Sequence, residues 1–140
     1  MTAWSTTDKS ANITLSGSNL VATTSSATQG AVRADTTFAS GKYYFECVYG
    51  TASGSNFGVG WANSTASLSS YIGVDKNGVA SFITNTNAAV YFNAGVVGNL
   101  GRTGIAGMTL CVAFDITNKL IWFRWGGGPW NGSGTVDPVS

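Results

Sequence analysis

Apolar residues in this chain recur in short alternating runs, and small polar residues interrupt the runs about every ten positions. β-branched and aromatic residues fill the runs, whereas Gly, Asn and Ser fill the gaps. No segment carries apolar residues at i, i+3, i+4 and i+7 over three turns, so the pattern predicts no helix. The runs predict strands at Asn12–Leu15, Leu20–Thr24, Gly30–Asp35, Lys42–Tyr49, Asn56–Trp61, Tyr71–Val74, Val79–Ile83, Ala89–Phe92, Met108–Phe114 and Lys119–Trp125. The expected fold class is therefore all-β, a sandwich or a barrel.

Some of the predicted strands are apolar on both faces. Lys42–Tyr49 alternates aromatic residues at both odd and even positions, so it is expected to lie centrally or to carry a ligand surface on one face. Leu110–Phe114 and Leu120–Phe123 are also apolar on both faces, and we expect both to be central. The tail over residues 126–140 is mostly Gly, Pro, Asn and Ser, and is expected to be loop.

Turns are predicted where Gly and Asn separate the runs. Ser16–Asn19 is expected to join the first two strands. Asp75–Gly78 ends in Asn-Gly, which accepts the positive φ of a hairpin turn. Thr117 and Asn118 are expected to join the two most apolar strands, again because Asn tolerates a left-handed backbone.

The composition narrows the function classes. The 140 residues form one expected domain, residues 1–140, and only 9% of them are charged, with a net charge of +1. Ser, Thr and Asn number 44, so the surface is expected to be neutral and polar. No basic run is present, which argues against nucleic-acid binding, and no run of about 18 apolar residues suggests a membrane span. The polar N-terminus lacks an apolar signal region, so synthesis in a cytoplasm is expected.

The ionisable residues argue against catalysis. The chain has no His, which removes the commonest general base and metal ligand, and no cofactor motif is present. Glu46 is the sole glutamate and is expected to be a structural carboxylate held by Arg33 or by a backbone donor. Cys47 and Cys111 are expected to be reduced, buried thiols, since a disulfide would require them on facing strands. We therefore predict no catalytic residue, no metal and no cofactor.

Aromatic residues are the candidate binding groups, because five Trp and five Tyr exceed what a core of this size requires. For each Trp, plain packing is the competing explanation, and Trp122 is expected in the core. The segment from Trp125 to Asn131 is the leading contact surface, followed by Asn63–Ser70 and Asn85–Ala89. The candidate partner-binding residues are Trp4, Trp61, Tyr71, Tyr91, Trp125, Trp130 and Asn131.

Several motifs taken in order resemble the SPRY family. The motifs are Val32–Ala34, Gly41–Glu46, Phe57–Trp61, Leu68–Gly73 with Asp75 and Gly78, Leu110–Asp115 and Lys119–Phe123. The resemblance implies a bent, jelly-roll-like sandwich of two antiparallel sheets that binds partners through loops at one rim and is not an enzyme. The abundance of Ser, Thr, Asn and Gly is most similar to SPRY-like modules in bacteriophage tail, fibre and head-associated proteins.

Three functions remain open for the chain. The first is a virion module, such as a capsid decoration or tail accessory protein, that contacts other virion proteins or copies of itself. The second is a module that binds a carbohydrate or host receptor, such as a host-surface glycan, through the aromatic rim. The third is a glycan-cleaving enzyme that uses Glu46 with Asp35 or Asp115.

The chain also departs from the family pattern near its end. Gly107-Met108 replaces the usual Gly-Asp, and residues 125–128 replace the expected Asn-Gly turn. The closing strand of the family has no obvious counterpart after Asn131. Either Met1–Thr24 closes the sheet, or an edge is left for a neighbour to cover.

Overall fold

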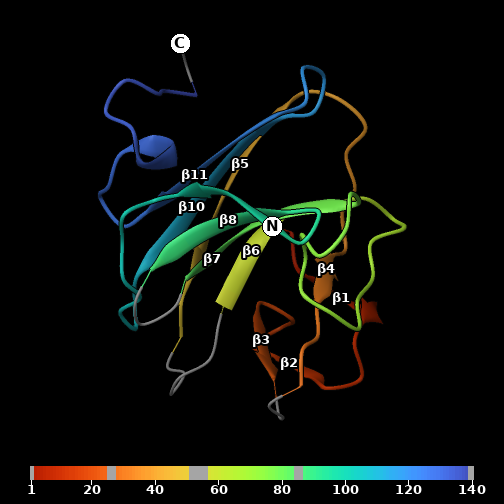
Figure 1. The fold of residues 1–140 in the computed structure, drawn as a ribbon. Coiled ribbons are helices and arrows are strands. Elements are labelled where there is room, and N and C mark those ends of the chain that lie inside the picture. The colour runs from red at the N-terminus through yellow and green to blue at the C-terminus, as the bar shows by residue number, and fades with distance from the viewer. Residues whose placement is uncertain (1, 25–27, 51–56, 84–86, 139–140) are drawn as a thin grey trace.

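The computed structural model describes residues 2–24, 28–50, 57–83 and 87–138, and these ranges are built from antiparallel strands. The predicted all-β class is confirmed, and the two larger sheets face each other as a sandwich (Figure 1). The strands are β1 (Trp4–Lys9), β2 (Ile13–Ser16), β3 (Val21–Thr24), β4 (Val32–Ala34), β5 (Lys42–Val48), β6 (Phe57–Ala62), β7 (Gly78–Ile83), β8 (Ala88–Phe92), β9 (Gly95–Asn99), β10 (Thr109–Asp115) and β11 (Leu120–Trp125). A short 3-10 turn, η1 (Trp130–Gly132), follows β11.

The first large sheet has the strand order β11-β10-β5. Opposed residues of an antiparallel pair share a face, and β10 places Leu110 opposite both Cys47 and Trp125. The inner face of this sheet carries Tyr43, Phe45, Cys47, Leu110, Val112, Phe114, Ile121, Phe123 and Trp125. The outer face carries Tyr44, Glu46, Cys111, Ala113, Trp122 and Arg124. The predicted central position is confirmed for β10 and is wrong for β11, an outer strand among the described residues. β5 is the other outer strand, which excludes the central position for Lys42–Tyr49 and leaves the alternative of a ligand surface on one face.

The second large sheet has the order β6-β7-β8-β9 and turns one face toward the first sheet. Its inner residues are Phe57, Val59, Trp61, Val79, Ser81, Ile83, Ala88 and Val90. They meet the inner face of the first sheet in one hydrophobic core, in which Ile83, Leu110 and Val112 are fully buried. Burial of this apolar area is the main favourable contribution to the folded state.

Trp125 joins the two sheets through a polar contact inside the core. Its indole Nε1 donates a hydrogen bond to Ser81 Oγ at 2.8 Å, and its ring meets the edge of Phe57 at a centroid distance of 6.3 Å. Trp125 is 1% exposed and Ser81 is 0% exposed. The prediction that Trp125 is a contact residue is therefore wrong: its position in β11 shares the inward alternation of Phe123, so it packs in the core.

The loop over residues 63–77 packs against the other face of the four-stranded sheet through Tyr71 and Gly73. The predicted strand at Tyr71–Val74 is wrong, because these residues form turns. Gly73 has φ +98°, which breaks an extended backbone, and a Cβ there would lie 2.6 Å from the Tyr91 carbonyl oxygen. The backbone of Ala94 donates to the Gly73 carbonyl at 2.9 Å, which fixes this crossing against the end of β8. The segment is thus held as a covering loop rather than a strand.

The N-terminal residues form two small antiparallel pairs, β1 with β4 and β2 with β3. Neither pair extends one of the two large sheets, since each forms a separate two-stranded sheet. The prediction that Met1–Thr24 closes the sheet is therefore wrong for residues 2–24. Arg33 on β4 links this part to the covering loop: its guanidinium binds Asp8 at 2.6 and 3.0 Å and donates to the carbonyls of Asn63, Ser64 and Ala66 at 3.0 to 3.2 Å.

Two strands were not predicted from the sequence. β1 is rich in hydroxyl residues and shows no apolar alternation, because it pairs with β4 alone and its register shifts along the pair. β9 contains two glycines and four exposed residues, so its pattern is equally weak. It follows β8 through Asn93 and Ala94, both with positive φ, which is the backbone of a tight two-residue hairpin turn. Asn93 was the local sign of this hairpin.

The remaining predicted strands are confirmed with ends shifted by at most two residues, and Asn56 lies outside the described residues.

The turn at Ser16–Asn19 is confirmed, with positive φ at residues 17–19. At the β10–β11 hairpin the positive φ falls on Lys119, not on Asn118. Asn118 instead donates to both carboxylate oxygens of Asp115, which lowers the pKa of that carboxyl. Asp75–Gly78 does not form the predicted hairpin, because no strand directly precedes it.

Gly60 on β6 allows its neighbour β7 to approach closely. A Cβ at this position would overlap the carbonyl oxygen of Val79 and lie 2.6 Å from the Cα of Ala80. Because the obstacle is backbone, Gly60→Ala is expected to lower the free energy of unfolding by about 1–3 kcal/mol, measured by urea denaturation. Gly134→Ala is the matched control, since nothing lies within 4 Å of a Cβ there. Equal stability of the two variants would show that the β7 backbone can move away from the added Cβ without a loss of stability.

Candidate functional site

A hollow of about 410 Å³ lies on the outer face of the β11-β10-β5 sheet. Figure 1 shows the segment after β11 turning back beside this sheet, with η1 close to β11. We call this site the Trp130 hollow. It is lined by Lys42, Tyr43, Tyr44, Ala113, Phe114, Trp122, Trp130, Asp137 and Pro138. Three separate parts of the chain therefore build it: β5, the β10–β11 hairpin and the C-terminal segment.

Trp130 is held in place by two side chains of the sheet. The guanidinium carbon of Arg124 lies 4.6 Å from the centroid of the Trp130 ring, which is a cation–π contact. The Tyr44 ring meets Trp130 edge-on at a centroid distance of 6.4 Å and an angle of 76°. Trp122 lies on the same outer face, opposite Ala113. The small Ala113 side chain leaves the space that the three larger rings surround.

A chain of polar side chains lies next to the hollow on the outer face. The Tyr44 hydroxyl donates to Glu46 Oε1, the Cys111 thiol contacts the same oxygen at 3.9 Å, and Arg124 Nη2 lies 3.7 Å from Cys111 Sγ. The hydrogen bonds with Cys111 and then Glu46 raise the pKa of Tyr44 well above its ordinary value, so its hydroxyl stays protonated. Glu46 is thus bound by groups of its own sheet. The prediction that Arg33 holds it is wrong, because Arg33 is engaged by Asp8 and the loop carbonyls.

Asn131 covers the outer edge of β11. Its Oδ1 accepts a hydrogen bond from the backbone N–H of Phe123 at 2.8 Å, and its Nδ2 donates to the Ile121 carbonyl at 3.5 Å. The residue has φ +49° and ψ +25°, a left-handed conformation that Asn tolerates. The side-chain amide therefore pairs with β11 as a neighbouring strand would, and fixes η1 beside the hollow.

Removing this amide is expected to expose the β11 edge. Asn131→Gly keeps the left-handed backbone accessible but deletes the acceptor for Phe123, so the free energy of unfolding should fall by about 1 kcal/mol. Hydrogen exchange of the Phe123 amide, followed by NMR, should become faster. Asn131→Asp is the control that keeps Oδ1, and its Phe123 amide should stay protected. Unchanged exchange in Asn131→Gly would show that Asn131 does not cover this edge.

The structure separates the predicted binding residues instead of gathering them at one rim. Trp130 and Asn131 lie together at the hollow and its flank. Trp61 packs against the core from the inner face of β6, so its predicted place on a rim is wrong. Trp125 is in the core, as described above. The segment from Trp125 to Asn131 therefore contributes only its second half to a surface.

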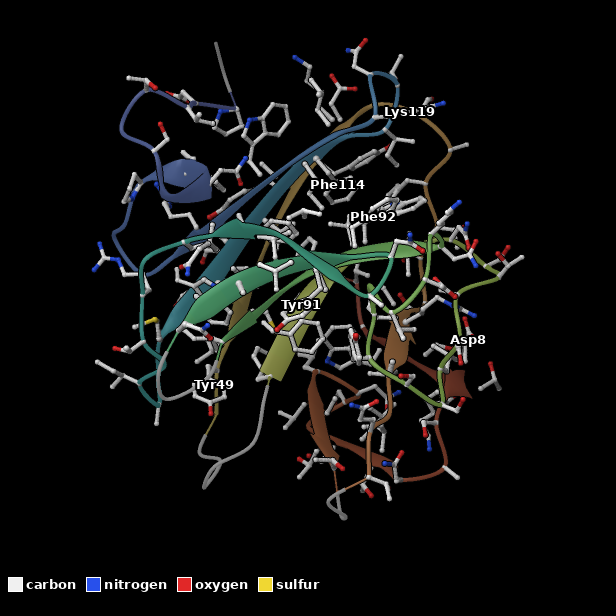
Figure 2. All side chains as sticks on the ribbon, viewed as in Figure 1. Asp8, Tyr49, Tyr91, Phe92, Phe114 and Lys119 are labelled. Atoms are coloured by element: carbon white, nitrogen blue, oxygen red, sulfur yellow. The ribbon has the colours of Figure 1, made fainter. Side chains whose placement is uncertain are left out.

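Tyr71 and Tyr91 meet on the far side of the four-stranded sheet, where both contact Phe82. The three ring centroids are 5.4 to 5.8 Å apart with angles of 75 to 89°, an edge-to-face cluster. Figure 2 shows Tyr91 on the side of this sheet nearer to β1–β4, away from Phe114 and β10. Phe82 also covers Gly58 on the adjacent strand. Half-buried packing beneath the covering loop explains this cluster, and it is separate from the Trp130 hollow.

Of the residues that line the hollow, Trp130 alone was among the predicted binding residues. Tyr44 is 52% exposed, and the sequence had allowed a ligand surface on one face of its strand. Trp122 was predicted in the core but is half-buried on the outer face, opposite Ala113. No local pattern separates Trp122 from Phe123, because both faces of β11 are aromatic. Of the loops suspected next, Asn63–Ser70 is bound by Arg33, and residues 85 and 86 of Asn85–Ala89 lie outside the described residues.

Several ionisable side chains have structural partners in the described ranges, among them Asp8, Glu46 and Asp115. Within them, no three His, Cys, Asp or Glu side chains lie close enough to share a metal ion. Cys47 and Cys111 are free thiols on opposite faces of adjacent strands, since Cys47 opposes Leu110 and Cys111 opposes Glu46. Burial raises the pKa of the Cys47 thiol. No helix in the part of the chain that the structure describes is long and apolar enough to span a membrane.

The fold and the hollow together define an all-β sandwich with a neutral aromatic surface. No protein family profile and no curated protein sequence matches this chain.

Proposed function

We propose that this chain is a non-enzymatic, SPRY-like module of a bacteriophage virion that acts through protein–protein contacts. Its partners in this proposal are other virion proteins or copies of itself. A capsid decoration protein or a tail accessory protein would have this role.

The exposed valines of β9 are the observation that carries the proposal. Val96 pairs with Tyr91, Val97 lies where the register of β9 shifts, and the two valines are 59% and 61% exposed. β9 is the last strand in the order of its sheet and contains no charged residue and no Pro. Exposed edge strands are normally protected by such residues or by a β-bulge, because an unprotected edge pairs with other chains, and β9 has only the register shift near Val97. A partner strand added beside β9 would cover both valines and the edge.

The positions of the family motifs support the SPRY part of the proposal. Gly41–Glu46 leads into β5, Phe57–Trp61 forms most of β6, and Leu110–Asp115 with Lys119–Phe123 forms the β10–β11 hairpin. Leu68–Gly73 belongs to the covering loop instead of a strand. Two of the motifs and most of two others therefore lie in strands of the two larger sheets.

The test measures association of the purified chain with itself and with particles. Light scattering after size exclusion reports self-association, and co-sedimentation with purified virions of the phage that encodes the chain reports particle binding. Val96→Lys with Val97→Lys is expected to weaken the observed association at least about tenfold, because two charges would be desolvated in the contact. The matched control is Thr14→Lys with Ser16→Lys, which adds the same charges to exposed positions on β2.

Two results would refute the proposal. In the first, the unmodified chain associates neither with particles nor with itself. In the second, the β9 variant and the β2 control bind equally well, which would remove β9 from the contact.

A further inference from the structure

The Trp130 hollow has the size and the wall chemistry of a small-ligand site. Its volume of about 410 Å³ falls in the range of ligand pockets, about 300–1,000 Å³. A smaller hollow of about 280 Å³ lies beside β9 and β11. Its lining is aliphatic apart from Phe123 and Asn131, and the Asn131 amide already binds the β11 backbone. The Trp130 hollow alone of these two combines aromatic rings with charged groups.

The walls of the Trp130 hollow suit a flat ligand with both C–H and hydroxyl groups. Tyr44, Trp122 and Trp130 supply three rings from different segments. The face of an aromatic ring is electron-rich, so it attracts the weakly positive C–H groups along one face of a pyranose sugar. Hydroxyl groups of such a sugar would require donors and acceptors at the margin of the same space.

Lys42 and Asp137 place one positive and one negative side chain in the lining. The Lys42 side chain is 77% exposed and its ammonium lies 4.0 Å from Asp115, so the ammonium can donate to a bound hydroxyl. A carboxylate such as Asp137 accepts hydrogen bonds from hydroxyls. Because the two charges are opposite, the lining has no net charge to attract a phosphate or another polyanion. These features favour a neutral ligand over a charged one.

The ring of Trp130 is positioned before any ligand arrives. Arg124 lies 4.6 Å from its centroid, and Tyr44 meets it edge-on. Asn131, the next residue, is hydrogen-bonded to β11, which restricts the backbone on which Trp130 sits. Ordering a platform in advance lowers the entropy lost on binding.

From these observations we infer that the Trp130 hollow is a binding site for neutral glycans, in which a pyranose unit packs against Trp130 and Trp122 and hydrogen-bonds to Lys42 and Asp137. The site is distinct from the β9 edge and does not depend on the proposed protein contacts.

The experiment titrates the isolated chain with neutral hexasaccharides of glucose, mannose and N-acetylglucosamine, and with two charged probes, sialyllactose and a heparin hexasaccharide. Isothermal calorimetry and the NMR shifts of the Trp130 and Trp122 indole N–H groups are the measurements. At least one neutral probe is expected to bind with a Kd of about 1 mM or tighter and to shift both indole signals.

Variants then locate the binding. Trp130→Ala removes one wall, and Ala113→Leu fills the hollow while all three rings remain. Each is expected to weaken binding of the selected probe at least about tenfold. Phe92→Ala, an exposed aromatic residue on the other sheet, is the control and should bind normally. A protected Phe123 amide verifies in each variant that the β11 edge is still covered.

The inference fails if no neutral probe binds, if only the charged probes bind, or if Ala113→Leu binds as well as the unmodified chain. Loss of binding in Phe92→Ala to the same degree would also contradict it, because the effect would then not be local to the hollow. Loss of particle association in the β9 variant tests a different surface and leaves this inference unaffected.

Discussion

Replacing Trp125 by Ala is expected to lower the free energy of unfolding by about 3–5 kcal/mol, the largest effect expected of the substitutions considered. The ring is 1% exposed and lies between the sheets, so its loss removes apolar burial and leaves a cavity against Phe57. The substitution also leaves Ser81 Oγ without its hydrogen-bond donor, although this hydroxyl is fully buried. Urea denaturation followed by far-ultraviolet circular dichroism measures the change independently of Trp fluorescence.

Trp125→Phe separates the two contributions. It retains most of the apolar volume but removes the donor, so about 1–3 kcal/mol is expected from the stranded Ser81 hydroxyl and the smaller ring. Adding Ser81→Ala should recover part of this loss, because the unsatisfied group is then gone. A double-mutant cycle on these two positions should show a coupling of about 0.5–3 kcal/mol. Strict additivity would mean that the hydrogen bond contributes no coupling to stability.

Arg33→Ala is expected to cost the next largest amount, about 2–4 kcal/mol. The guanidinium, whose side chain is 18% exposed, binds the Asp8 carboxylate and three loop carbonyls. Without it the N-terminal pairs and the covering loop lose their shared polar anchor. Denaturation measures the loss of stability, and limited proteolysis should cleave within residues 63–70 faster than in the unmodified chain.

Two further variants test the cause of the Arg33 effect. Arg33→Lys keeps the charge but cannot span the carboxylate and the carbonyls together, so it should restore less than half of the lost stability. Lys42→Ala removes a different ion pair, with Asp115 at 4.0 Å, whose Lys side chain is 77% exposed. Its effect is expected to stay below about 1 kcal/mol, as for other exposed pairs. If Arg33→Ala were as mild as Lys42→Ala, the anchoring role would be refuted.

A polar, uncharged surface and a small number of anchors characterise the molecule. Only 9% of the residues are charged, and the ion pair of Arg33 with Asp8 helps to hold the N-terminal strands to the covering loop. The two proposed contact surfaces, β9 and the Trp130 hollow, carry no net charge in their strand or lining. We therefore expect binding at either surface to change little with salt, since screening acts on charges.

The strands with strong local patterns were predictable. β5, β10 and β11 are long apolar runs bounded by polar residues, and the hairpin at residues 16–19 contains the Gly and Asn that a left-handed turn requires. β1 and β9 were not predictable in this way, because edge strands with few buried side chains need no apolar alternation. At Tyr71–Val74 the residue types predict a strand, but the structure has a turn there. Gly73 has a positive φ and lies close to the Tyr91 backbone.

The candidate site was only partly predictable for a related reason. Trp125 and Trp130 stand five positions apart around a glycine-rich stretch, and their residue types do not distinguish them. Their surroundings do: Trp125 is hydrogen-bonded to Ser81 in the core, whereas Trp130 stacks on Arg124 outside the sheet. Trp122 lines the hollow because the residue opposite it on β10 is Ala113, whose small side chain leaves the space open.

By itself the sequence determined the all-β class, the neutral polar surface, the absence of histidine chemistry and the positions of the strongest strands, since these depend on composition and on alternation over a few neighbouring residues. Only the tertiary structure decided which face of each two-sided strand became core, that Arg33 binds Asp8 instead of Glu46, and that the C-terminal segment returns to build a hollow with β5. These outcomes depend on which residues meet across sheets from positions far apart in the chain, and no local pattern records that pairing.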